Sequence, residues 1–257
     1  MKTRRFGVAA VGLIALAALA TGCKSTAQPG AGASASTSAA ASAPAQQAAA
    51  ADALAAAAGK LKETTAKMSV TMSAGVAGMT VTGQLDGPGR KSASVMDVMG
   101  MKMEFVSIAD EVWLKAAAVP GMPKGWMHID TAKLGPQSSL RKSLEDPSYS
   151  SKMLATATQV QWDGTGKVKG VLDLSQGPSA NAAMVAKLGD KVKAVPFTAT
   201  IDDQGRLTSM TVATAELSPT AGVGDMKIAY SDFGAPVTVE KPTGEIVEAP
   251  AAVLALL

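Results

Sequence analysis

The sequence predicts an α+β domain built on a single, largely antiparallel β-sheet, with a few helices covering its apolar face. Two observations support this fold class. From residue 68 onward, successive segments alternate apolar and polar residues with a period of two, as strands with one buried face do. Short turn sequences separate these segments, which favours hairpins between neighbouring strands. Helical patterns are few, so one sheet of roughly eight to ten strands is the economical architecture.

The composition excludes several classes of protein. The chain has 257 residues, of which 47% are hydrophobic, so it can bury a sizeable core and is not wholly disordered. Its one cysteine, Cys23, rules out an intramolecular disulfide framework and a cysteine-built zinc site. Its one histidine, His128, argues against a multi-histidine metal centre or a Ser-His-Asp triad. We therefore expect no metal and no cofactor.

The positive net charge of the chain comes from its first 22 residues. They carry Lys2, Arg4 and Arg5 and no acidic residue. Without these three, 21 of the 24 basic residues remain against 21 acidic residues, a formal net charge of zero. Nucleic-acid binding depends on clustered positive charge, so we expect no nucleic-acid partner.

Residues 1–22 have the pattern of a secretory signal peptide. Met1–Arg5 are positively charged, Phe6–Ala20 are apolar, and small residues precede the cysteine. The apolar stretch is shorter than the roughly 20 residues of a membrane-spanning helix, which argues against a transmembrane anchor. The pair Arg4-Arg5 leaves both the general secretory route and twin-arginine export open.

The end of this segment, Ala20-Thr21-Gly22-Cys23, resembles the lipobox of bacterial lipoproteins. That family prefers leucine where this chain has Ala20. The resemblance implies that Cys23 is lipidated, becomes the mature N-terminus and anchors the chain on the extracytoplasmic face of the cell membrane. The alternative for Cys23 is a buried free thiol, but the polar residues that follow it argue against burial.

Residues 23–50 are assigned to this lipidated cysteine and a flexible tether. Positions 24–50 contain almost only Ala, Ser, Gly, Thr, Gln and Pro, a composition that buries too little surface to order a chain. As a flexible coil, this tether has a root-mean-square reach of roughly 30 Å. It would hold residues 51–257 away from the membrane while allowing them to lean back to it.

Residues 51–257 are sufficient for one domain and show no second linker or internal repeat. We expect an Ala-rich helix over 51–66, with Leu54, Ala58 and Leu61 on its apolar side. Alternation and turn residues then predict strands near 68–76, 79–85, 91–99, 101–105, 111–116, 126–130, 158–162, 167–174, 195–201, 206–216 and 226–230. Further helices are expected near 138–145, 148–157 and 179–188.

Motifs of catalysis are missing from the sequence, so we expect no enzyme. There is no nucleophile elbow, no phosphate-binding loop and no dinucleotide-binding glycine pattern. Asp202-Asp203-Gln204-Gly205 superficially suggests a calcium loop, but the same residues are typical of a hairpin turn, which we favour. His128 alternates with apolar residues in a strand and is expected to face solvent or to hydrogen-bond a neighbour.

Methionine is the unusual feature of the composition. Beyond the initiator there are 13 methionines against nine aromatic residues, and many fall on the predicted apolar face. Flexible thioether side chains fill irregular gaps and also suit surfaces that accept varied apolar ligands. Core packing and a lipid pocket are therefore both open interpretations.

Several of these features together resemble actinobacterial lipoproteins of the LppX/LprG type, which are related in fold to LolA-like carriers. The resemblance rests on the lipobox, the tether, the helix that leads into a strand meander, the hairpin containing Val195-Pro196-Phe197 and Gly205-Arg206, and the ending Tyr230–Val237. It covers most of 51–242. It implies a strongly curved, open half-barrel sheet with helices at its mouth and an apolar cavity on the concave face.

We therefore predict a membrane-anchored lipoprotein that binds acylated lipid or glycolipid, with transfer as an optional further activity. It is expected to be a monomer. The alternative is a non-catalytic envelope interaction or sensory module with a packed core. From alternation in this sequence, the cavity residues are predicted to be Met72, Val81, Met103, Phe105, Leu172, Phe197, Ile201 and Ile228.

The C-terminal residues Ala249–Leu257 end in an apolar sequence that is too short to span a membrane. Three roles are open for this tail: it binds a partner, packs on the sheet or plugs the cavity. Packing on the sheet is the simplest expectation.

Overall fold

The computed structural model describes residues 43–74, 77–135, 138, 140–141, 150–176, 182–217 and 223–254. The strands are β1 (Thr65–Ala74), β2 (Ala77–Asp86), β3 (Lys91–Val98), β4 (Met101–Ile108), β5 (Glu111–Lys115), β6 (Trp126–Asp130), β7 (Ala157–Trp162), β8 (Lys167–Leu172), β9 (Val195–Ile201), β10 (Leu207–Val212), β11 (Val223–Ser231) and β12 (Ile246–Glu248). The α-helices are α1 (Ala43–Lys60), α3 (Ser150–Leu154), α4 (Ala182–Leu188) and α5 (Ala251–Leu254). Short 3-10 helices are η1 (Thr131–Lys133), η2 (Leu174–Gln176), η3 (Gly189–Lys193) and η4 (Thr214–Leu217).

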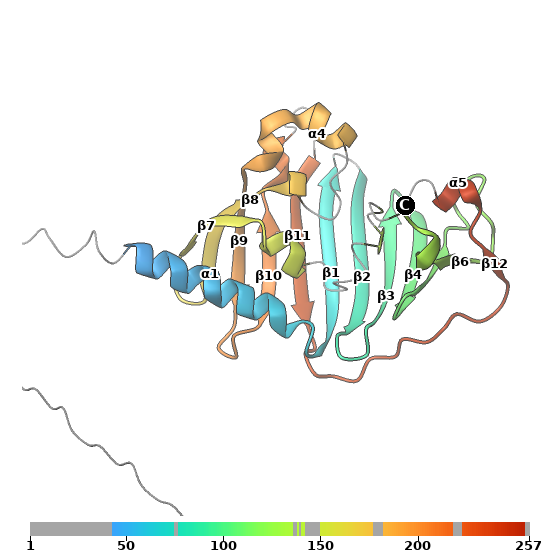
Figure 1. The fold of residues 1–257 in the computed structure, drawn as a ribbon, viewed down its shortest axis with the longest axis horizontal. Coiled ribbons are helices and arrows are strands. Elements are labelled where there is room, and N and C mark those ends of the chain that lie inside the picture. The colour runs from blue at the N-terminus through green and yellow to red at the C-terminus, as the bar shows by residue number, and fades with distance from the viewer. Residues whose placement is uncertain are drawn as a thin grey trace, which may run out of the picture. The chain divides into compact units, whose positions relative to one another are not determined.

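All twelve strands form one sheet in the order β12-β6-β5-β4-β3-β2-β1-β11-β10-β9-β8-β7 (Figure 1). Two meanders, β1 to β6 and β7 to β11, meet where β1 pairs with β11. Neighbouring strands are antiparallel except for β12 and β6, which run parallel. The edge strands β7 and β12 do not pair with each other, so the sheet stays open.

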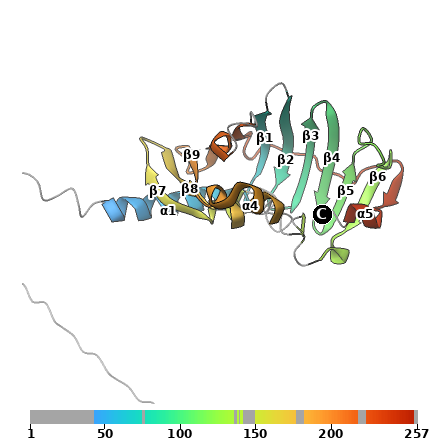
Figure 2. The same cartoon turned by 90° about the horizontal axis from the view of Figure 1, so that it is seen from above.

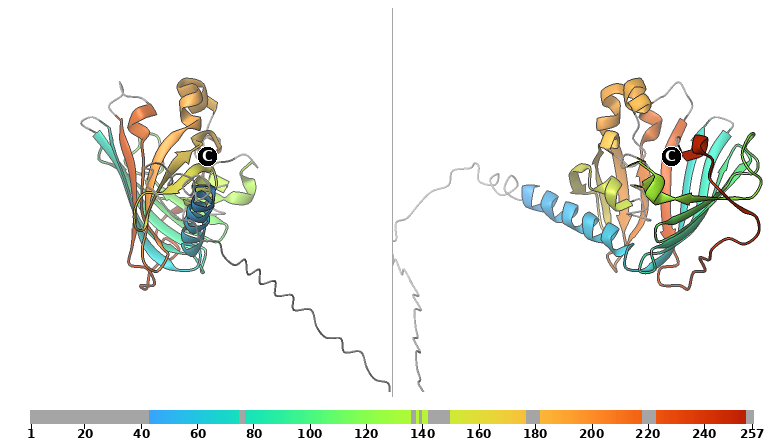
Figure 3. Two further views of the ribbon diagram at one scale, coloured as in Figure 1. Left: turned by 90° about the vertical axis from the view of Figure 1, so that its left-hand side faces the viewer. Right: turned by 45° about the vertical axis from the view of Figure 1, so that its right-hand side comes forward.

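Figures 2 and 3 show that this open sheet is curved, with α1 against one half of its inner side. The structure thus confirms the predicted fold class of a single, largely antiparallel half-barrel with a few helices on its concave face. None of the helices among the described residues is long and apolar enough to cross a bilayer.

The first core cluster lies between α1 and the inner face of β7 to β11. The helix contributes Ala50, Leu54, Ala57, Ala58 and Leu61, each no more than 2% exposed. Small alanine side chains allow the helix backbone to approach the sheet closely, and the two leucines fill the spaces between them. This packing closes one half of the concave side.

The second core cluster lies at the other end of the inner face, on β5 and β6. Leu114, Met127 and Ile129 are at most 5% exposed there and pack with Ala249 and Val253 from the C-terminal tail. Of the three roles open for this tail, packing on the sheet is therefore the one that its described residues adopt.

A third, smaller cluster lies on the outer face. The segment 232–245 crosses this face without regular secondary structure, and its Val239 packs against Val106 and Trp113. The Thr65 hydroxyl donates a hydrogen bond of 2.7 Å to the Ala235 carbonyl oxygen, and the Gln84 amide donates to the Thr238 carbonyl. After this segment, the chain forms the edge strand β12, which pairs with β6.

Several element boundaries differ from the sequence-based expectations. Helix α1 runs from Ala43 to Lys60 rather than over 51–66: its packed side already includes the buried Ala50, and Thr65 and Ala66 belong to β1. Residues 43–50, which we assign to the tether, are therefore helical. The sheet has twelve strands rather than eight to ten, because each of the eleven expected segments contributes one strand and Ile246–Glu248 adds β12. The strand predicted over 206–216 ends at Val212, and Thr214–Leu217 form η4 instead. The helix expected near 138–145 lies mostly outside the described residues.

Candidate functional site

The middle of the concave face, on β1 to β4, is apolar and lies between the two inner core clusters. We call it the open apolar face and define it by Met72, Met79, Val81, Met96, Val98, Met101 and Met103. Each of these residues is at least partly exposed, and Met101 is 38% exposed. In contrast, the inner faces of the flanking strands are covered by α1 or by the C-terminal tail.

The strand register aligns these side chains in rows across the sheet. Val70 of β1 is opposite Val81 of β2, which is opposite Met96 of β3, and Met96 is opposite Met103 of β4. Side chains opposite one another on the same face of antiparallel strands are neighbours. Period-two alternation alone therefore produces a continuous apolar strip that runs across four strands.

The open apolar face carries no charged residue. The inward positions of β1 to β4 are Ala66, Met68, Val70, Met72, Met79, Val81, Gly83, Leu85, Ser92, Ser94, Met96, Val98, Met101, Met103, Phe105 and Ser107. Such a surface has no general acid, base or ion-pairing group to offer a substrate. It offers dispersion contacts with adaptable thioethers and suits a flexible apolar ligand.

The eight predicted cavity residues divide into two sets. Leu172, Phe197, Ile201 and Ile228 lie in the first core cluster beneath α1, between 0% and 8% exposed. The inward alternation is as predicted, but α1, together with Met153 and Leu154 of α3, already covers this part of the face.

The other four predicted residues remain partly exposed. Met72 and Val81 lie within the open apolar face, and Met103 and Phe105 lie where this face meets the second core cluster. The structure thus brings these four to one continuous surface, and their role in binding stays a prediction. Cys23, the predicted site of lipid attachment, lies outside the described residues.

The outer face has two hollows that the sequence did not predict. Each has a volume of about 360 Å³. The first lies over β2 to β4 and is bordered by Lys67, Glu104 and Trp126. The second lies over β7 to β11 and is bordered by Lys169 and Asp225. They are bordered by polar residues such as Lys67 and Lys169 and by apolar residues such as Val95 and Val171, and nothing in the spacing of these residues distinguishes a hollow from an ordinary solvent-facing surface.

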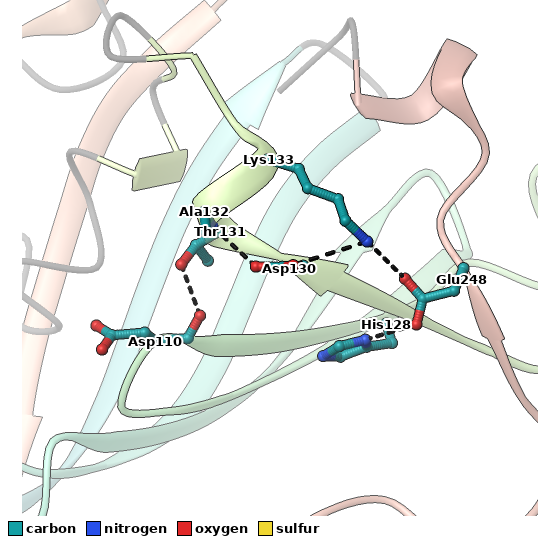
Figure 4. Close-up of polar contacts among 7 residues, drawn as sticks. All are labelled: Asp110, His128, Asp130, Thr131, Ala132, Lys133 and Glu248. Atoms are coloured by element: carbon teal, nitrogen blue, oxygen red, sulfur yellow. Dashed lines mark hydrogen bonds and ion pairs between the residues drawn. The ribbon is translucent and has the colours of Figure 1, made fainter.

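A polar cluster joins Glu248 of β12, directly before the tail, to β6 and η1 (Figure 4). His128 Nδ1 donates a hydrogen bond of 2.9 Å to Glu248 Oε1, and Lys133 Nζ lies 3.6 Å from Glu248 Oε2. This confirms the expectation that His128 is hydrogen-bonded to a neighbour. Lys133 also lies 3.7 Å from Asp130 Oδ2.

The contacts of Glu248 in this cluster keep it ionised. The hydrogen bond from His128, with the nearby positive charge of Lys133, holds the pKa of Glu248 below its usual value. Glu248 is therefore a carboxylate that accepts a hydrogen bond from His128 of β6 and pairs with Lys133 of η1. Its contacts are those of a structural fastening between the tail and the sheet.

The predicted calcium-like sequence at residues 202–205 forms a turn between β9 and β10. Asp202 Oδ1 accepts hydrogen bonds from the backbone N–H groups of Gln204 and Arg206, at 3.0 and 2.9 Å. Arg206 Nε donates a further bond of 2.7 Å to Asp202 Oδ2. Within the part of the chain that the structure describes, no group of three or more His, Cys, Asp or Glu residues could hold a metal ion.

Comparisons with known proteins find likeness only among solved structures. No protein-family model matches the chain, and no curated protein matches it. A DUF1329 family protein from Desulfovibrio piger is similar, with a TM-score of 0.31 and 12% identity over 76% of this chain and 95% of that one. A LolA superfamily protein from Nitrosomonas europaea has a TM-score of 0.28 and 9% identity, over 72% of this chain and 94% of that one.

A chain in the MucA/MucB complex from Pseudomonas aeruginosa is also similar. The TM-score is 0.36 and the identity 13%, over 74% of this chain and 58% of that one. The assignment of the fold class therefore rests on the twelve-stranded sheet of this chain itself.

Proposed function

We propose that this chain is a lipid-anchored, extracytoplasmic lipoprotein that binds acylated lipid or glycolipid on its open apolar face. The observation that carries the proposal is the uncharged, methionine-rich open apolar face on β1 to β4, where of the seven defining residues only Met103 packs against a core cluster. Anchorage through Cys23 and a position outside the cytoplasm follow from the lipobox and signal-peptide patterns. The resemblance to LppX/LprG-type lipoproteins supports the same proposal.

Binding would be passive and driven by apolar burial. Each methylene group that leaves water contributes about 0.8 kcal/mol, so a long acyl chain gains several kcal/mol on the strip from Val70 to Met103. Methionine side chains can change rotamer to follow different chains, so the surface would select for apolar length more than for chemical detail.

The alternative, an envelope interaction module with a packed core, also has an observation in its favour. Four of the eight predicted cavity residues are buried beneath α1, and the first core cluster fills that half of the half-barrel. A ligand must therefore bind beside α1 rather than under it.

Uptake of cis-parinaric acid, a fluorescent fatty acid, by the full chain tests the proposal. Val81→Glu places a charge on the open apolar face, and we expect it to weaken uptake at least tenfold. Val95→Glu is the matched control: Val95 lies on the next strand, on the outer face, and is 39% exposed. Equal uptake by both variants and the unchanged chain, or no uptake by any of them, would exclude the open apolar face as a lipid site and favour the interaction module.

A further inference from the structure

One hairpin at the rim of the half-barrel has an unusual turn. β3 and β4 are joined by the two residues Met99 and Gly100, with φ angles of +56° and +82°. Two positive φ angles define the type I′ turn, for which Asn-Gly is the preferred sequence. A methionine in the left-handed region is strained by about 1 kcal/mol relative to glycine.

Met99 is also the most exposed large hydrophobic residue among those described. It is 70% exposed, and its neighbour across the turn, Met101, is 38% exposed. In a turn that only faces water, a methionine here has no stabilising role, because its backbone is strained and its side chain is exposed to solvent. The adjoining inward residues of the hairpin, Val98 and Met101, are paired with each other and belong to the open apolar face.

The opposite end of the same strand provides the contrast. β4 and β5 are joined by Ala109 and Asp110, and Ala109 has a φ of +53° in a similarly exposed two-residue turn. There the side chains are small or charged, and Asp110 forms an ion pair of 2.9 Å with Arg90. Among the described residues, the turn Met99-Gly100, which we call the rim turn, therefore carries exposed apolar bulk that the β4–β5 turn lacks.

Exposed lysines lie at the same end of the sheet as Met99. Lys124 precedes β6, Lys187 lies in α4 and Lys191 in η3, and these connections meet the strand ends on the side of the rim turn. Among the described residues these three make no ion pair, whereas Lys193 is 2.8 Å from Asp190. Figure 1 shows α4 and the β3–β4 hairpin at this common end.

We propose that this rim docks on an anionic bilayer surface, with Met99 inserted among the lipids and Lys124, Lys187 and Lys191 facing the headgroups. Apolar side chains at a membrane interface gain burial, and each nearby lysine adds electrostatic attraction to anionic lipids. Docking in this orientation brings the end of the open apolar face that carries Val98 and Met101 to the membrane. It does not require that this face binds a ligand, so the proposal stands apart from the proposed function.

Oxidation of methionine to its sulfoxide measures insertion at the turn directly. The full chain carrying Ala109→Met is incorporated into vesicles, so the native Met99 and the introduced methionine report from the two ends of β4. Mass spectrometry follows the oxidation of each by hydrogen peroxide, with and without vesicles. We expect phosphatidylglycerol vesicles to slow oxidation of Met99 roughly tenfold, as burial of most of a methionine side chain implies, and to leave the introduced site unchanged.

Charge and turn variants complete the test. Lys124→Glu combined with Lys187→Glu should remove most of the protection of Met99, and phosphatidylcholine vesicles should protect it severalfold less than phosphatidylglycerol vesicles. Met99→Asn should raise the thermal unfolding temperature, because asparagine suits the left-handed position. Equal protection at both ends of β4, no protection at Met99, or protection that ignores lipid charge would overturn the proposal.

Discussion

Substitution of Phe197 by alanine distinguishes a packed core from an open cavity beneath α1. Phe197 is 2% exposed, and its ring lies so close over Gly170 that a Cβ atom there would be 2.8 Å from Phe197 Cε1. Removing a fully buried phenyl ring costs roughly 3–5 kcal/mol of unfolding free energy. A ring that lined an open, solvent-filled cavity would contribute far less.

Urea unfolding of the full chain, followed by circular dichroism, measures this loss. Phe105→Ala is the control, because Phe105 is only partly buried at the border of the open apolar face and should cost clearly less. A loss below about 1 kcal/mol for Phe197→Ala would refute the packed core. It would mean that α1 does not close over β9 in solution and that Leu172, Phe197, Ile201 and Ile228 are available to a ligand.

A double-mutant cycle with Gly170→Ala sharpens the result. In the unchanged chain, the added methyl group meets Phe197 and also lies 2.9 Å from the Thr158 carbonyl oxygen, so we expect a loss of roughly 1–3 kcal/mol. Without the ring, one of these two contacts disappears, and the loss should fall by at least about 0.5 kcal/mol. Strict additivity would show that the ring does not lie over Gly170.

Substitutions of two glycines and of two aspartates test local structure. Gly59→Ala in α1 should raise the unfolding free energy by about 1 kcal/mol, since an added Cβ meets nothing within 4 Å. Gly100→Ala should lower the unfolding free energy, because Gly100 has a φ of +82°. Thermal unfolding of both variants checks the two signs.

The hydrogen bond from Arg206 holds the pKa of Asp202 below its usual 3.8. This carboxylate therefore stabilises the fold above about pH 3.8, and the contribution is lost as the pH falls through the lowered pKa. Urea midpoints between about pH 2 and 6 should therefore depend less on pH in Asp202→Asn than in Asp203→Asn, and equal profiles would contradict the assignment.

Much of the fold was predictable from local patterns. Alternation placed the β1–β2 and β9–β10 hairpins close to their observed residues, because a side chain that must face the core on every second position leaves a strong period-two signal. The turn at 202–205 was predictable from its residue types, because aspartate and glycine suit the backbone of a tight turn. Twelve strands were not predictable, because the three residues of β12 pair only through a distant segment.

For the candidate site, the sequence predicted which side of the sheet each residue faces but not which residues stay uncovered. Alternation correctly assigned Met72, Val81, Phe197 and Ile228 to the inner side of the sheet. It could not show that α1 covers Phe197 and Ile228 and leaves Val81 open, because helix placement depends on contacts between residues more than 100 positions apart. The path of the segment 232–245 across the outer face was not predictable either, because it depends on contacts with distant residues such as Val106 and Trp113.

By itself, the sequence determined the fold class, the inward and outward faces of each strand and the lack of charge on the inner face. Those properties follow from the local periodicity of side chains, which each strand carries without reference to the rest of the chain. Only the tertiary structure decided which part of the apolar face is covered, that the tail fastens to β6, and that Met99 stands exposed at the rim. Coverage is a property of long-range packing: it depends on where α1 and the tail come to rest, and many arrangements would satisfy the same local pattern.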